Sequence, residues 1–380
     1  MDLSERVSGL SGSATFKYAG LAGKPGVINL TVGRPNYDTP RVIKEAAKKA
    51  LDEGKVHYTP TKGIPELRAK IAEKLTVENG IPGIDADKVV VSGGAKSVLY
   101  YIFTALVDGG DVVALPDPSW VSYESMVALM GGKVSWLKTS PEGGFVPDEE
   151  YLSALENSGA KVTLVNSPNN PTGAFYPKKI LKKIVDICER KGMWLISDEV
   201  YEVFSFDERP YSPGQDYENT ITVNAFSKTF SMTGWRLGYA ASPRKEVVAA
   251  ILNVQEQCLS CPTSFAQYGA LACLTEEARA ESRRMAEDFK ARRDFCMKKI
   301  SDIQNVVCKK PGGAFYLFPY FGKVDDVKLA DRLLEKGVGT IPGSPFGAQG
   351  RGCLRLSYGS ANIEQLDKAF DTMAEVVSDE

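Results

Sequence analysis

The sequence has very little histidine and no excess of charge of either sign. Its 380 residues include a single histidine, His57, which excludes zinc sites built on several histidines. His57 is also the only candidate for the base of a serine–histidine or cysteine–histidine pair. The 46 lysines and arginines against 48 aspartates and glutamates give a net charge of −2. A chain without a basic excess is a poor nucleic-acid binder, so we expect no nucleic acid partner.

Cysteine is sparse, and long hydrophobic runs are missing. The seven cysteines are an odd, scattered set, which is typical of reduced thiols in a cytoplasmic protein. Cys258 and Cys261 form a lone C-x-x-C that no second pair or nearby histidine completes, so we predict no metal. Residues 1–10 carry charges and lack the apolar core of a signal peptide. The uncharged stretch 257–275 contains a proline and several polar residues, and it predicts a buried helix rather than a membrane span.

Hydrophobic residues follow two different periods along the chain. Short β-rich runs, several of them apolar throughout, come between segments with helical spacing such as 42–51 and 67–75. This order predicts an α/β fold in which helices cover a mostly parallel sheet. The candidate strands are 27–32, 88–91, 112–115, 162–166, 194–197, 220–224 and 237–241.

A long charged amphipathic segment at 278–303 predicts a helix, and a smaller α+β region follows it. Candidate strands of that region lie near 313–318, 338–341 and 353–357. We place a domain boundary within the long helix. The large domain then covers 41–285, and a small domain combines 1–40 with 286–380.

Two single residues stand out directly after predicted strands, at the end of a parallel sheet where ligands bind. Lys228 follows the run 220–224, in a turn of small residues that leads to Arg236. Such a lysine can form a Schiff base when burial or a neighbouring cation lowers its pKa; the alternative is a surface lysine in a loop. Asp198 follows the apolar run 194–196, where a carboxylate is costly unless a cation pairs with it. The alternative role for Asp198 is a helix N-cap.

Two further segments after strands are rich in turn residues. Residues 166–173 (NSPNNPTG) are consistent, by themselves, with a simple turn. Residues 92–97 (SGGAKS) join a strand to a helical run, and a glycine-rich turn at a helix N-terminus can bind a phosphate through backbone N–H groups. This segment matches neither the P-loop nor the three-glycine dinucleotide motif.

In this order, the four segments resemble those of the class I aminotransferases, fold-type I enzymes that depend on pyridoxal 5′-phosphate. The resemblance covers essentially the whole chain. Other matching segments are GRPNYDTP at 33–40, HYTP at 57–60, GIPELR at 63–68, GAFY at 313–316, PGSPFG at 342–347 and RLSY at 355–358. The resemblance implies a ping-pong reaction between an L-amino acid and a 2-oxo acid. It also implies a homodimer whose subunits share their active sites.

The resemblance also implies a role for each matching residue. Lys228 would bind the cofactor covalently and move protons, and Asp198 would pair with the pyridinium N–H. Tyr201 and Asn170 would hydrogen-bond the ring oxygen, and Trp120 would stack on the ring face. The implied phosphate ligands are Gly94, Ala95, Lys96, Ser227 and Arg236, together with Tyr58 from the neighbouring subunit. The implied substrate site consists of Arg355, as a bidentate partner of the α-carboxylate, with Gly33, Trp120 and Asn170.

Three positions depart from the usual residues of the family. Ala225 replaces the serine or glycine that usually stands three residues before the lysine. Arg34 stands where an acidic residue is common, and Lys96 where glutamine or glutamate is usual. None of the three removes catalytic machinery, but they leave the phosphate contacts and the choice of substrate open.

The amino donor is the least constrained part of the prediction. A dicarboxylate donor needs a cation for its distal carboxylate, and the candidates are Lys96, Arg34, Lys62 and Lys17. Thr15 resembles a position that lines the pocket in the aspartate-preferring branch, so we expect aspartate with 2-oxoglutarate. Aromatic amino acids or alanine are alternative donors. A C–S lyase or a decarboxylase is an alternative reaction, and a non-catalytic regulator is an alternative of another class.

Overall fold

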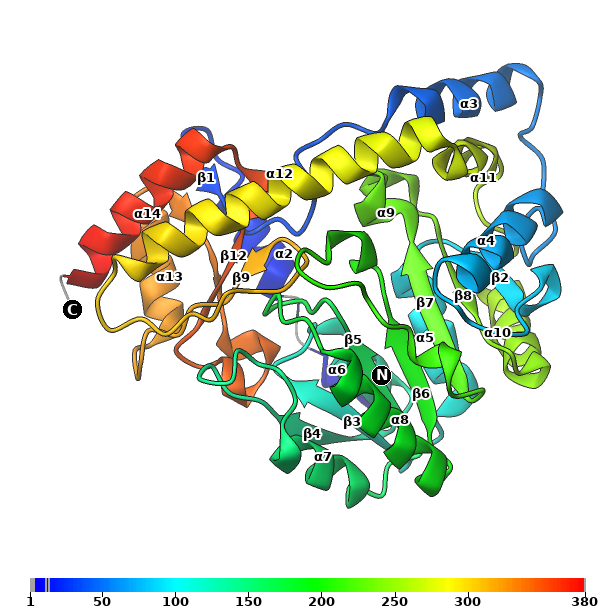
Figure 1. Ribbon diagram of the computed structural model, residues 1–380, viewed down its shortest axis with the longest axis horizontal. Helices are drawn as coiled ribbons and strands as arrows, with labels where there is room; N and C mark the ends of the chain where they lie inside the picture. The colour runs from blue at the N-terminus through cyan, green and yellow to red at the C-terminus, as the bar shows by residue number, and fades with distance from the viewer. Residues whose placement is uncertain (1–3, 11, 13, 379–380) are drawn as a thin grey trace.

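A mixed sheet of strands β2 to β8 forms the centre of the larger part of the molecule (Figure 1). The computed structural model describes residues 4–10, 12 and 14–378. Within these ranges the sheet has seven strands in the order β2-β8-β7-β6-β5-β3-β4. They are β2 (Val89–Ser92), β3 (Val112–Asp117), β4 (Lys133–Lys138), β5 (Val162–Asn166), β6 (Trp194–Asp198), β7 (Thr220–Ala225) and β8 (Gly238–Ala241). β8 is antiparallel to β2 and β7, and the other pairs are parallel, which confirms the predicted α/β class.

Helices cover both faces of this sheet because successive strand side chains point to opposite sides. Val113 and Leu115 pack with α5 (Ala95–Leu106), α6 (Ser122–Leu129) and α10 (Lys245–Cys258). Ala114, between them in β3, belongs to the core that contains α7 (Glu149–Glu156) and α8 (Lys178–Lys191). A third apolar cluster joins the β2 and β8 end of the sheet to α3 (Arg41–Asp52), α4 (Pro65–Val77) and α11 (Ser264–Leu271).

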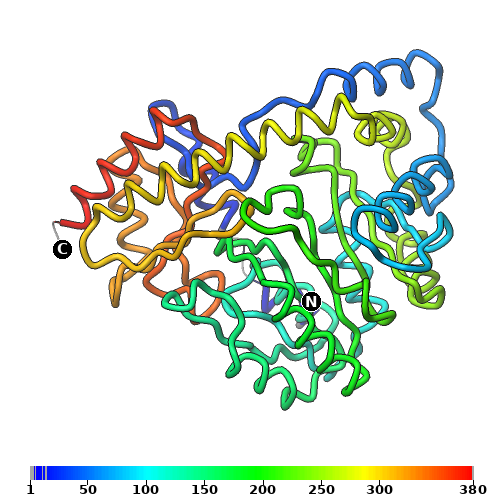
Figure 2. Tube along the Cα trace, viewed as in Figure 1, coloured from blue at the N-terminus to red at the C-terminus, as the bar shows by residue number. Residues whose placement is uncertain are grey.

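The long helix predicted near 278–303 is α12 (Glu276–Ser301), and it runs across the molecule (Figure 1). Its N-terminus is capped by Thr275, whose hydroxyl accepts the N–H of Ala278. Beyond it, β9 (Tyr316–Leu317), β11 (Ile341–Pro342) and β12 (Leu354–Ser357) form an antiparallel sheet, flanked by α13 (Asp326–Glu335) and α14 (Ile363–Ser378). The N-terminal segment, which carries α1 (Glu5–Ser8) and α2 (Ala14–Leu21), also lies partly beside this C-terminal region (Figure 2).

Three local predictions were wrong. The strand expected at 27–32 is only β1 (Ile28–Asn29), which pairs with β10 (Val338–Gly339) outside the main sheet. The segment 257–275 is not one helix, because α10 ends at Cys258 and α11 begins only at Ser264. Ser260 between them has a positive φ of 63°, which a helix cannot accommodate. Strand β4 was missed, since it begins and ends on exposed lysines at the edge of the sheet.

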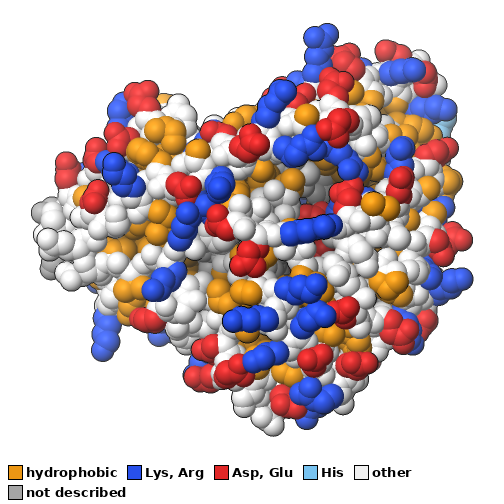
Figure 3. Space-filling model, in the orientation of Figure 1, with side chains coloured by type: hydrophobic (Ala, Val, Ile, Leu, Met, Phe, Trp, Pro, Cys, Tyr) orange, Lys and Arg blue, Asp and Glu red, His pale blue; other side chains and the backbone are white. Residues whose placement is uncertain are grey.

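Charges of both signs are mixed on the face of the molecule shown in Figure 3. Figure 3 shows Lys and Arg interspersed with Asp and Glu on the visible face, as expected for 46 against 48 such residues. No helix in the described ranges has both the length and the apolar character needed to cross a lipid bilayer. All seven cysteines are free.

Candidate active site

The functional candidates meet at the edge of the sheet where the parallel strands end. Asn166 ends β5, Asp198 ends β6, and Ala225 ends β7 directly before α9 (Phe226–Thr229), the short helix that carries Lys228. A cavity of about 490 Å³ lies at this edge. Ligands of open α/β sheets bind at this end of the strands, because loops and helix N-termini converge there.

Most of the residues predicted for the site line this cavity. They are Gly33, Ala95, Lys96, Trp120, Asn170, Asp198, Tyr201, Ser227, Lys228, Arg236 and Arg355. Gly94 lies just behind this wall, since a Cβ there would come within 2.7 Å of the Arg236 guanidinium. Tyr58 does not line the cavity of its own chain, and its side chain is 91% exposed.

Of the four candidate cations for a distal carboxylate, the structure places two in the cavity and two outside it. Lys96 and Arg34 line the cavity, as does Thr15. Lys62 points elsewhere and donates to the backbone oxygen of Asp87, and Lys17 lies against the ring of Tyr18.

Lys228 is held as a buried amine. Its Nζ donates a 2.6 Å hydrogen bond to the backbone oxygen of Gly33. Burial, and then the cations Arg355 and Arg236, lower the Lys228 pKa to about 8, against an opposing effect of Asp198. An amine with this pKa is still mostly protonated near physiological pH, but its neutral fraction is more than a hundredfold larger than that of an ordinary lysine, and this fraction can act as a nucleophile or a base.

Asp198 is a buried carboxylate with a hydrogen-bond donor on each oxygen. Tyr123 donates to Oδ2 at 2.6 Å, and the N–H of Val200 donates to Oδ1 at 3.3 Å. Burial raises the pKa of Asp198 to about 6, while these two bonds and Lys228 act in the opposite direction. Asp198 caps no helix within the described residues, because irregular turns follow β6. A cationic N–H group in the cavity would be a suitable partner for it.

Arg355, in strand β12, contributes its guanidinium group to the lining of the cavity. Its Nη1 donates to Oδ1 of Asn170 at 3.0 Å, and its Nη2 donates to the backbone oxygen of Thr31 at 2.6 Å. Its Nε is buried and has no hydrogen-bond partner. The guanidinium lies 4.9 Å from the ring centroid of Tyr316, whose hydroxyl is 2.8 Å from that of Tyr201.

The opposite end of the cavity is built for an anion. Helix α5 begins at Ala95, and its N-cap Gly94 has a φ of 100° and no side chain to accept the first N–H groups. Lys96 and Arg236 add two cations at this end. Arg236 itself has a φ of 55°, a left-handed conformation that is uncommon for a side-chain-bearing residue and often marks a functional position.

Two aromatic residues of the site were not predicted as site residues. Tyr123 lies three residues after Trp120, so the first turn of α6 brings both to the cavity, with ring centroids 5.2 Å apart. Tyr316 is the last residue of the GAFY segment and lines the cavity beside Tyr201. Tyr316 also explains Gly33, because a Cβ at that position would come within 2.5 Å of the Tyr316 hydroxyl.

Comparisons with known proteins agree with this geometry. The family model described as aminotransferase class I and II matches residues 25–373. The chain is 40% identical to an aspartate/prephenate aminotransferase of Thermus thermophilus, over 99% of this chain and 98% of that protein. It is 37% identical to aromatic-amino-acid aminotransferase 2 of Thermococcus litoralis, over 100% and 99% of the two chains.

A solved structure extends the agreement to the whole fold. The aspartate aminotransferase of Thermus thermophilus with maleate superposes with a TM-score of 0.93 at 39% identity, covering 99% of this chain and 100% of that one. The predicted fold-type I architecture is thereby confirmed. The chain belongs to the class I and II aminotransferase family.

Proposed function

We propose that this aminotransferase uses pyridoxal 5′-phosphate to transfer the amino group of L-aspartate to 2-oxoglutarate. The observation that carries the choice of donor is that two cations, Arg355 and Lys96, line one cavity. Arg355 offers a fork for an α-carboxylate, and Lys96 offers a separate charge for a second carboxylate. The relatives named as aspartate aminotransferases support the same donor.

The residues at the cavity fit the cofactor that the family uses. The uncapped N–H groups at the start of α5 suit a phosphate, with Arg236 as its charge partner, and buried Asp198 suits a protonated ring nitrogen. The Thr15 hydroxyl and the Arg355 Nε are buried and have no hydrogen-bond partner among the described residues, so a ligand in the site could satisfy both. When bound, the cofactor supplies a ring that accepts the electrons released at the substrate Cα.

Each residue of the chain then has a defined task. Lys228 would bind the cofactor covalently, and its Nζ would later carry the proton removed from the substrate. Asp198, held by Tyr123, would keep the ring nitrogen protonated. Tyr201 and Asn170 would hydrogen-bond the ring oxygen, Trp120 would cover the ring face, and Ser227, which lines the same cavity, would add a hydroxyl to the phosphate site.

The buried charge of Arg355 favours substrates that carry an α-carboxylate. Arg355 is fully buried, and its charge is expensive to leave without an anion, so an occupied site is favoured over an empty one. Lys96 lies 4.8 Å from the ring centroid of Trp120, which positions its charge at the edge of the same cavity. Burial and the neighbouring Arg236 lower the Lys96 pKa, so a carboxylate placed beside it would strengthen its charged form.

We also propose a homodimer in which Tyr58 completes the partner's phosphate site. Its 91% exposure supports this role, since it leaves the ring and hydroxyl accessible to a second subunit. His57, next to it and also exposed, is then an interface position. The domain division at 41–285 against 1–40 with 286–380 is supported by the sheets, because the main sheet lies entirely in the first range. The unpaired cysteines support a cytoplasmic location.

A donor panel with 2-oxoglutarate tests the function, using wild type and Lys96→Met. We expect aspartate to be preferred, and Lys96→Met to raise KM for aspartate while changing KM for alanine little. Preference for phenylalanine or tyrosine that persists in Lys96→Met would instead favour an aromatic aminotransferase. Release of pyruvate and ammonia without a 2-oxo acid would indicate a lyase.

Lys228→Ala tests the cofactor attachment. The variant should lose the borohydride-reducible absorption band of the bound cofactor and nearly all turnover. Normal transamination by Lys228→Ala would show that another residue binds the cofactor.

A further inference from the structure

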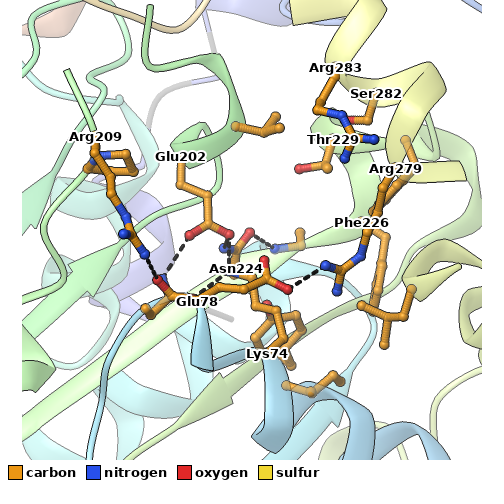
Figure 4. A pocket seen from close by; sticks show the side chains of 18 residues that line it. Lys74, Glu78, Glu202, Arg209, Asn224, Phe226, Thr229, Arg279, Ser282 and Arg283 are labelled. Carbon is orange, nitrogen blue, oxygen red and sulfur yellow. Dashed lines mark hydrogen bonds and ion pairs between the residues drawn. The ribbon is translucent and has the colours of Figure 1, made fainter. Parts of the chain in front are cut away.

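A second cavity, of about 400 Å³, is lined by Phe226 and Thr229, which flank Lys228 in the sequence (Figure 4). Its walls come from α4, α12, residues 202–210, and the end of β7 with α9. Ala225 lines both this cavity and the first one. The proposed reaction uses none of the other residues that line it.

One part of the second cavity is apolar. Phe226, Phe230 and Tyr239 form an aromatic group with ring centroids 5.8 to 6.5 Å apart, and Ile71 and Leu274 extend this wall. A surface of this kind accepts the flat or branched apolar body of a small molecule.

The same cavity contains hydroxyl groups without partners. Ser282 is 3% exposed, and its Oγ has no hydrogen-bond partner. The hydroxyls of Thr229 and Tyr239 also make no hydrogen bond within the described part of the chain. A buried polar group is normally paired, so the Ser282 hydroxyl indicates a ligand or ordered water in this cavity, and Thr229 and Tyr239 add two further hydroxyls to its lining.

Cations outnumber carboxylates around these hydroxyls. Lys74, Arg209, Arg279 and Arg283 line the cavity together with Glu78 and Glu202. Glu202 already accepts hydrogen bonds from Lys74, Asn79 and Asn224, and Glu78 pairs with Arg279 at 2.6 Å.

Figure 4 shows Glu202 on one side of the cavity and Arg279, Ser282 and Arg283 on the other. Arg209 donates only to the backbone oxygen of Glu78, at 2.9 Å, and pairs with no carboxylate of the described residues. Arg283 pairs with Glu276, which does not line the cavity, so the four cations face three carboxylates and the remaining positive charge favours an anion.

We propose that the second cavity binds a small organic carboxylate with an apolar body, and that this ligand changes the reactivity of Lys228. The carboxylate would lie between Arg279, Ser282 and Thr229, with the apolar body against Phe226 and Phe230. Phe226 and Thr229 flank Lys228 in the four-residue helix α9, so a ligand packed on them acts on the segment that positions the Lys228 amine.

Calorimetry on the holoenzyme tests the binding site, with 3-phenylpropionate as the probe and maleate present in excess to block the first cavity. We expect saturable binding of one probe per chain, and binding at least about tenfold weaker for the neutral 3-phenylpropanamide, which lacks the charge. Absence of binding in the presence of maleate would overturn the proposal.

Variants locate the probe. Arg279→Gln should weaken binding about tenfold by removing a charged donor, and Ser282→Leu should abolish binding by filling the cavity. Arg284→Gln is the matched control, because Arg284 is an exposed residue of the same helix and does not line the cavity. Unchanged affinity in both Arg279→Gln and Ser282→Leu would place the probe elsewhere and refute the site.

The effect on Lys228 is measured separately, by titrating the absorption of the bound cofactor with pH. The midpoint should shift when the probe is added to wild type and should not shift in Ser282→Leu. A midpoint that is the same with and without saturating probe in wild type would refute the coupling to Lys228.

Discussion

The hydroxyl of Tyr123 donates a 2.6 Å hydrogen bond to Oδ2 of Asp198, and both side chains are buried. Burial by itself would favour the neutral acid, because a carboxylate loses its hydration in the interior. The Tyr123 bond opposes this, since it stabilises the charged form. Asp198 thus stays available as an anion at the position where the proposed mechanism needs one.

Tyr123→Phe tests this relationship. Without the hydroxyl, the pKa of Asp198 should rise above about 6, so the acid limb of the kcat/KM profile should move to higher pH. We expect kcat/KM at neutral pH to fall about tenfold, the usual effect of losing one hydrogen bond to a charge. Tyr151→Phe is the control, because the Tyr151 hydroxyl is buried without a partner and lies outside the site. Superimposable profiles for Tyr123→Phe and wild type would contradict the role of Tyr123.

Arg355→Lys tests the α-carboxylate site while keeping the positive charge. An ammonium cannot form the bidentate pair, so KM for aspartate should rise about tenfold or more. The variant should also discriminate less between aspartate and the same compound with its α-carboxylate converted to an amide. An unchanged KM, or unchanged discrimination, would mean that Arg355 does not bind the α-carboxylate.

The sequence predicts the residues whose importance follows from their place in a strand or turn. Asp198 and Lys228 stand out because each directly follows an apolar strand, and the structure places both in one cavity. Tyr123 and Tyr316 do not stand out, since their roles depend on how α6 and β9 approach β6 in three dimensions.

The second cavity lies beyond sequence-based prediction for the same reason. The cavity forms only where α4, α9 and α12 come together. Helix α4 lies more than a hundred residues before the other two in the sequence. The wrong prediction of one helix over 257–275 has a local cause. The left-handed Ser260 breaks a segment whose composition is otherwise compatible with a helix.

The low pKa of Lys228 gives a measurable pH dependence in the protein without cofactor. Labelling of Lys228 by an amine-reactive reagent, followed by mass spectrometry, should be half-maximal near pH 8. Arg355→Met should move this midpoint to higher pH, because it removes a cation that disfavours the charged amine. Arg351→Met is the control, since Arg351 is exposed and does not line the cavity. A midpoint near the ordinary lysine value in wild type would refute the buried, neutral amine.

Glu199 predicts a pH dependence of stability rather than of catalysis. Its carboxylate is buried and accepts hydrogen bonds from Ser197, Ser212 and Asn79. Burial, and then the charge of Glu202, raise its pKa from 4.5 to about 7. The folded state therefore holds this proton more tightly than the unfolded state. The stabilisation is complete below pH 4.5 and is lost as the pH rises through about 7.

Glu199→Gln removes this titration while keeping a side chain of the same shape. The variant should be more stable relative to wild type at pH 8 than at pH 5. The measured quantity is the free energy of unfolding of the variant minus that of wild type, from urea unfolding at both pH values. Glu208→Gln is the control, because Glu208 is exposed, and its difference from wild type should be the same at both pH values. If Glu199→Gln also gave the same difference at both, the proton on Glu199 would not be linked to folding. The three hydrogen bonds from Ser197, Ser212 and Asn79 would then be holding an ionised carboxylate throughout this range.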